Sequence, residues 1–109
     1  MKYYRIDFPF RVTDSQIDLT VRLILESQHT SAQRFNSRDF YVVLWPEHPS
    51  GGIDSRRLIP FLERSGIRYL DYTQIPEGHA PGALTPYDRH PTAQLHEAVA
   101  KRIVEDLKI

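Results

Sequence analysis

Ionisable side chains gather in the stretch of sequence between residues 71 and 90. It contains Asp71, His79, Asp88 and His90, and a proline follows His90 directly. A carboxylate that orients an imidazole allows the ring to act as a general base toward a nucleophile such as a serine hydroxyl. Asp88 and His90, with one residue between them, are therefore the candidate proton-transfer pair of this chain.

The elements that must position this pair are two strands and a final helix. The unbroken apolar run FYVVLW at 40–45 predicts a strand buried on both faces, as in parallel sheets. IRYLDY at 67–72 predicts a second strand nearer a sheet edge, and residues 74–91 read as a long loop, which in a compact domain is usually functional. Thr92 can cap a helix with an apolar stripe through Leu95 and Val99.

Two further helices are expected, one before the first strand and one between the two strands. Thr13-Asp14-Ser15 predicts a helix start, with Asp18 completing a capping box from Ser15, and the helix should close at Asn36. A second helix can begin at Asp54 or Ser55. Pro60 either kinks it or occupies its first regular turn, and Gly66 stops it. Residues Tyr3 to Phe10, which include Pro9, predict either a short edge strand at 3–8 or an extended entry.

The order of helix, strand, helix, strand, loop and helix predicts an α/β fold with a parallel sheet and right-handed crossovers. Two central strands, even with an edge strand, are too few for a stable open sheet. We therefore expect residues 1–109 to be a single partial domain, corresponding to the C-terminal half of a three-layer α/β/α sandwich. The missing N-terminal half, or a second copy of the chain, would be its partner.

The segment DRHPTAQLH, from Asp88 to His96, resembles the last conserved block of the SGNH/GDSL hydrolases and acyltransferases. In that family an Asp and a His precede a Pro just before the final helix, and a further His often follows six residues later. The resemblance extends over residues 38–109. It implies the flavodoxin-like α/β/α fold, with His90 as the general base, Asp88 as its orienting carboxylate and His96 as a structural residue.

The implied reaction is ester hydrolysis or acyl transfer through a serine acyl-enzyme. Its substrate would be a small ester or another acylated molecule, and it needs neither a metal nor an organic cofactor. Many family members have two residues between Asp and His, whereas this chain has one, a spacing that resembles other branches of the family. Tyr87 occupies the position of the more distant Asp. Leu95 stands where a small glycine is common.

The family's Gly-Asp-Ser block and its oxyanion-hole Gly and Asn have no counterpart here. The first glycine is Gly51 and the only asparagine is Asn36. Thr13-Asp14-Ser15 is the nearest imitation of the serine block, but its residues already suffice as a helix cap. The nucleophilic serine is therefore expected outside this chain, which alone should be inactive.

Composition narrows the function classes. Acidic and basic residues balance at 14 each, which argues against a nucleic-acid partner. The absence of cysteine excludes disulfides and thiolate chemistry and suits a reducing compartment, cytoplasmic by default. No signal peptide and no membrane-spanning run is expected in this chain.

Several residues keep a second interpretation. The histidines show no metal-binding spacing, and Glu47-His48 lies in a proline-flanked loop. Trp45 could line a pocket or pack in the core. The aromatic residues before position 11 could form a docking patch or a local core. The alternative function is a non-catalytic α/β interaction module that pairs through an exposed sheet edge.

Overall fold

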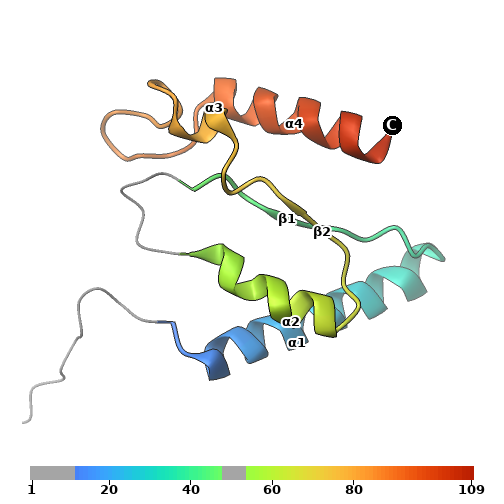
Figure 1. Cartoon of the computed structure of the whole chain (residues 1–109). Helices are drawn as coiled ribbons and strands as arrows, with labels where there is room; N and C mark the ends of the chain where they lie inside the picture. The colour runs from blue at the N-terminus through green and yellow to red at the C-terminus, as the bar shows by residue number, and fades with distance from the viewer. Residues whose placement is uncertain (1–11, 48–53) are drawn as a thin grey trace, which may run out of the picture. The chain divides into compact units, whose positions relative to one another are not determined.

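The computed structural model describes residues 12–47 and 54–109. Along the chain it contains α1 (Asp14–Phe35), β1 (Val42–Leu44), the 3-10 helix η1 (Ser55–Leu58), α2 (Ile59–Arg64), β2 (Tyr69–Asp71), α3 (Pro76–His79) and α4 (Ala93–Leu107) (Figure 1). The expected order of helices and strands is confirmed. The short helix α3 is an addition within the predicted loop 74–91, and the predicted strand at 3–8 lies outside the described residues.

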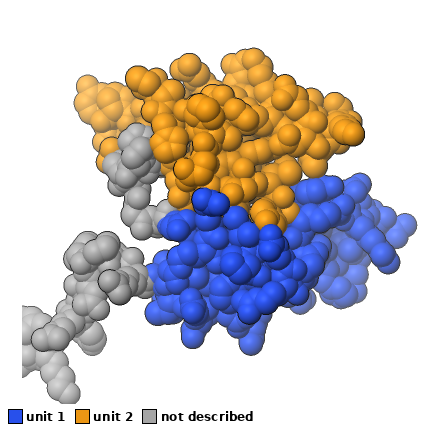
Figure 2. All heavy atoms as spheres, viewed as in Figure 1, with its two compact units in different colours: residues 1–41, 52–68 blue, residues 42–51, 69–109 orange. Residues whose placement is uncertain are grey.

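The chain divides into two compact units (Figure 2). Unit 1 comprises Met1–Tyr41 and Gly52–Arg68 and contains α1, η1 and α2. Unit 2 comprises Val42–Gly51 and Tyr69–Ile109 and contains both strands, α3 and α4. The candidate pair Asp88 and His90 therefore belongs to unit 2, together with the sheet.

In unit 1, α1 starts at a reciprocal cap. The Thr13 hydroxyl accepts a hydrogen bond from the backbone N–H of Gln16 at 3.2 Å, and the Gln16 side-chain oxygen accepts one from the Thr13 N–H at 2.8 Å. The capping box predicted from Ser15 and Asp18 is therefore wrong by two positions, because the helix begins at Asp14 with Thr13 as its cap and Ser15 already lies inside it. The helix ends as predicted at Asn36, which adopts the left-handed conformation.

The second helical segment resolves the two interpretations of Pro60. Asp54 caps η1 by accepting a hydrogen bond from the Arg56 N–H at 3.1 Å, and α2 follows with Pro60 in its first turn. The first-turn alternative is confirmed, since a proline there loses no helical hydrogen bond. Gly66, at φ +68°, follows the helix at the predicted stop. Among the described residues of unit 1, the buried apolar side chains are Ile17, Val21, Leu62 and Ile67.

Unit 2 is built on a parallel pair of strands. Val42, Val43 and Leu44 lie opposite Tyr69, Leu70 and Asp71. Both strands are shorter than the predicted strands at 40–45 and 67–72. Backbone hydrogen bonds continue the pairing beyond them, from the Tyr72 N–H to the Leu44 carbonyl at 3.0 Å and from the Glu47 N–H to the Thr73 carbonyl at 3.1 Å.

Helix α4 packs its apolar stripe on this sheet. Thr92 caps it as predicted, accepting a hydrogen bond from the Leu95 N–H at 3.4 Å. The core of unit 2 contains the buried residues Tyr72, Ile75, Ala83, Leu95 and Val99, with Val43, Trp45, Leu70 and Ile103 packed against it. The core-packing alternative for Trp45 is confirmed. The described chain is thus a mixed α/β structure with a two-stranded parallel sheet.

Candidate active site

The part of the predicted loop that carries Asp88 and His90 is a closed turn between α3 and α4. The Thr85 N–H donates to the His90 carbonyl at 2.9 Å, and the Arg89 N–H donates to the Thr85 carbonyl at 3.1 Å. Leu84 and Pro91 then form an isolated antiparallel bridge. These backbone contacts close the chain on itself, so that residues 85–90 project as one short turn immediately before the cap of α4.

Asp88 is held within this turn by its own hydrogen bonds. Its Oδ1 accepts a hydrogen bond from the Thr85 hydroxyl and another, at 3.4 Å, from the His90 N–H. The Thr85 hydroxyl bond, followed by the His90 N–H and the His90 ring, lowers the pKa of Asp88 below its ordinary value. The carboxylate therefore stays ionised at neutral pH, which is the state that can stabilise an imidazolium.

The imidazole of His90 lies near this carboxylate without being bound to it. His90 Nε2 is 3.9 Å from Asp88 Oδ2, longer than a hydrogen bond, and the two side chains are 75% and 63% exposed. In a triad the carboxylate meets Nδ1 and leaves Nε2 for the serine hydroxyl. The structure thus brings Asp88 and His90 close together, but the His90 ring is exposed and makes no hydrogen bond with the Asp88 carboxylate.

The other chemically active residues of the stretch have different surroundings. Asp71 Oδ1 accepts hydrogen bonds from the Thr73 N–H at 3.0 Å and the Thr73 hydroxyl at 2.6 Å, which ties Asp71 to the turn after β2. His79 ends α3 and is exposed. Tyr87, at the alternative Asp position, is 98% exposed. The structure therefore groups only Asp88 and His90 of the original four.

Two residues of the turn were missed by the sequence interpretation. Thr85 supplies the hydroxyl that holds Asp88, and Arg89 sits between the pair at φ +57°. Together with His79, Leu84 and neighbouring residues they line a shallow hollow of about 320 Å³. A threonine three residues before an Asp is a signal for such a local side-chain turn, and it was available in the sequence.

The helix after the turn carries the later histidine of the motif. The rings of His96 and Trp45 lie with their centroids 5.0 Å apart, inclined at 52°. Since Trp45 packs against the core of unit 2, this contact places the first turns of α4 against the chain that leaves β1. The Trp45 indole N–H is buried and has no hydrogen-bond partner among the residues described.

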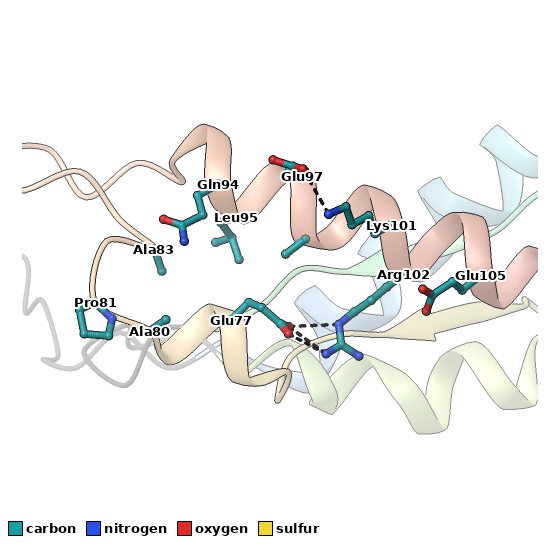
Figure 3. A pocket seen from close by; sticks show the side chains of 11 residues that line it. Glu77, Ala80, Pro81, Ala83, Gln94, Leu95, Glu97, Lys101, Arg102 and Glu105 are labelled. Carbon is teal, nitrogen blue, oxygen red and sulfur yellow. Dashed lines mark hydrogen bonds and ion pairs between the residues drawn. The ribbon is translucent and has the colours of Figure 1, made fainter.

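A separate groove runs between α3 and α4 (Figure 3). Arg102 donates to both carboxylate oxygens of Glu77 at 2.9 to 3.1 Å, and Lys101 pairs with Glu97 at 3.3 Å. The Arg102 guanidinium is the main cause that lowers the pKa of Glu77. Among the described residues that line this groove, both cations, Lys101 and Arg102, already have carboxylate partners, so these residues offer no unpaired cation to an anionic ligand.

Within 12–47 and 54–109, no group of three His, Asp or Glu side chains gathers in a way that could hold a metal ion, and His48 lies outside these ranges. None of the described helices combines the length and the apolar character needed to cross a bilayer. Ser15, the weak nucleophile candidate, is exposed in the first turn of α1.

Comparison of the chain with models of known protein families, with curated proteins and with solved structures finds no match.

Proposed function

We propose that this chain is the C-terminal part of an SGNH-like serine hydrolase, with His90 as general base and Asp88 as the group that orients it. The fold would be one half of a three-layer α/β/α sandwich. A serine and an oxyanion hole outside this chain would complete the site. The reaction would be ester hydrolysis or acyl transfer on a small ester or acylated substrate.

The observation that carries this proposal is the turn itself. Asp88 is ionised, and its Oδ2 lies 3.9 Å from Nε2 of the exposed His90 ring on one closed turn. This turn follows the second of two parallel strands and directly precedes the capped helix α4. Loops that follow the strands of a parallel sheet are where such folds bind ligands. A rotation of the His90 ring, which nothing buries, would bring Nδ1 toward Asp88 and leave Nε2 for the serine.

The test is an esterase assay on the tagged protein, purified under native conditions from its source so that a partner carrying the serine is retained. With a generic aryl ester, His90→Ala should lower kcat about 10²-fold or more, because the proton acceptor is lost. His79→Ala, an exposed histidine on α3, is the matched control and should leave the rate unchanged. Equal rates for His90→Ala and the unaltered protein would refute the assignment.

A second candidate is the non-catalytic interaction module. Among the described strands the sheet has only β1 and β2, so each has one edge without a described partner strand. Unpaired edges favour pairing with another chain. A native preparation without esterase activity, which sediments as a dimer, would favour this module over the hydrolase.

A further inference from the structure

A second hollow lies in unit 1, at the C-terminal half of α1. It measures about 580 Å³, within the range of small-molecule sites. Its walls include the apolar side chains of Leu25, Ala32 and Phe40 and the basic side chains of His29, Arg38 and Arg68. No carboxylate is among the described residues that line it, so its charge is of one sign.

Arg68 is fixed in place at this hollow. Its guanidinium stacks over the Tyr41 ring at 4.4 Å from the centroid and donates to the Tyr41 hydroxyl at 3.1 Å. It also donates to the backbone carbonyl of Arg38. A guanidinium has five N–H donors in a rigid plane, so these contacts orient Arg68 and still leave donors for a ligand.

Arg38 is the second arginine that lines this hollow. Within 12–47 and 54–109 its side chain has no hydrogen-bond or ion-pair partner, in contrast to Arg102 in the groove of Figure 3. A hollow lined by charges of one sign concentrates the electrostatic potential and attracts the opposite charge. The hollow therefore combines the positive charge of two arginines, which no carboxylate among its described lining residues neutralises, with an apolar wall.

We propose that this hollow binds a small organic anion with an apolar body, such as an aromatic carboxylate. The carboxylate would accept charge-assisted hydrogen bonds from Arg38 and Arg68. The apolar body would lie against Leu25, Ala32 and Phe40. The proposal rests on unit 1 alone and is independent of the chemistry proposed for Asp88 and His90.

The test is a titration of the full chain, followed by two-dimensional amide NMR, with 2-naphthoate as the probe. Saturable shifts confined to the residues around the hollow are expected, with a Kd on the order of 1 mM. The neutral analogue 2-naphthamide and inorganic phosphate should each bind about tenfold more weakly, since one lacks the charge and the other the apolar body.

Arg38→Gln should weaken 2-naphthoate binding about tenfold, as expected for the loss of a charged hydrogen bond. Arg34→Gln removes the same charge from the last turn of α1, outside the hollow, and should leave binding unchanged. An unchanged far-ultraviolet circular dichroism spectrum verifies that both variants fold. The proposal fails if 2-naphthamide or phosphate binds equally well, if both variants weaken binding equally, or if no saturable shift occurs.

Discussion

At the scale of single residues, the backbone of Arg89 sets the geometry of the proposed catalytic turn. Arg89 adopts φ +57°, a left-handed conformation that costs a residue with a side chain roughly 1–2 kcal/mol. Its N–H is bonded to the Thr85 carbonyl at 3.1 Å, and the turn closes again through Thr85 and His90. The hydrogen bonds of the turn therefore hold a conformation that Arg89 alone would disfavour.

Substitutions at Arg89 should rank by their tolerance of this conformation. Arg89→Gly removes the steric cost, whereas Arg89→Val adds a branched side chain that fits the left-handed region poorly. We expect Arg89→Val to be less stable than Arg89→Gly by about 1 kcal/mol or more in urea unfolding. Tyr87→Val, at the 98% exposed neighbour, should change stability by less than about 0.5 kcal/mol. Equal midpoints for the two Arg89 variants would contradict a strained turn.

The pairing of Asp88 with His90 could be predicted from the sequence, but the hydrogen bonds that hold Asp88 were not. Asp88 and His90 do meet, because one intervening residue in a turn keeps two side chains close. The role of the Thr85 hydroxyl was not predicted, because the family motif begins at Asp88 and does not include Thr85. The open placement of the His90 ring also lay beyond sequence reasoning, since a ring orientation depends on neighbours in space.

At the scale of elements, helix ends were predicted better than strand lengths. Thr92 and Gly66 act as predicted because capping depends on one or two neighbouring residues. The apolar run at 40–45 produced only the strand Val42–Leu44. The length of a strand depends on backbone hydrogen bonds with a neighbouring strand, and the apolar residues at 40–45 do not specify how far that pairing extends. Helix α3, only four residues long, is too short to show helical periodicity.

Helix α3 approaches the chain after β1 at Gly78. A Cβ atom added to Gly78 would lie 2.7 Å from the Cβ of Pro46, closer than side-chain carbons approach one another. Glycine is therefore required here by space, and the contact joins α3 to the segment that leaves the sheet. Both residues are buried, so neither can move freely into solvent.

Gly78→Ala should destabilise the chain by about 1–3 kcal/mol, as overpacking in a core does. A double-mutant cycle separates this clash from the change in helix propensity. Pro46→Gly removes the opposing Cβ, so the cost of Gly78→Ala should shrink in the Pro46→Gly background. Urea unfolding of the four proteins measures both values. An identical cost in the two backgrounds would show that Pro46 is not the obstacle.

At the scale of the whole molecule, one part-buried hydrogen bond couples the sheet of unit 2 to its last helix. Tyr72 follows β2, and its hydroxyl donates to the Asp106 carboxylate near the end of α4 at 2.6 Å. Burial of the phenol, and then the hydrogen bond to Asp106 and its charge, raise the pKa of Tyr72 to about 12. Ionisation of Tyr72 would place a second negative charge beside Asp106.

The stability of the chain should therefore fall in alkali by way of Tyr72. An unfolded chain releases the phenol proton near pH 10, whereas the folded chain retains it until about pH 12. Because the unfolded state binds fewer protons in this window, this contribution to the free energy of unfolding is complete below pH 10. It is lost as the pH rises toward 12.

Tyr72→Phe removes the titrating group and should flatten this decline in stability, with a loss of about 1 kcal/mol at neutral pH. Urea midpoints read from the fluorescence of the single tryptophan, at pH values from 8 to about 11.5, measure the slope in both proteins. Tyr87→Phe, which alters an exposed phenol, should keep the original slope. A Tyr72→Phe slope as steep as that of the unaltered chain would instead assign the decline to the remaining tyrosines and lysines.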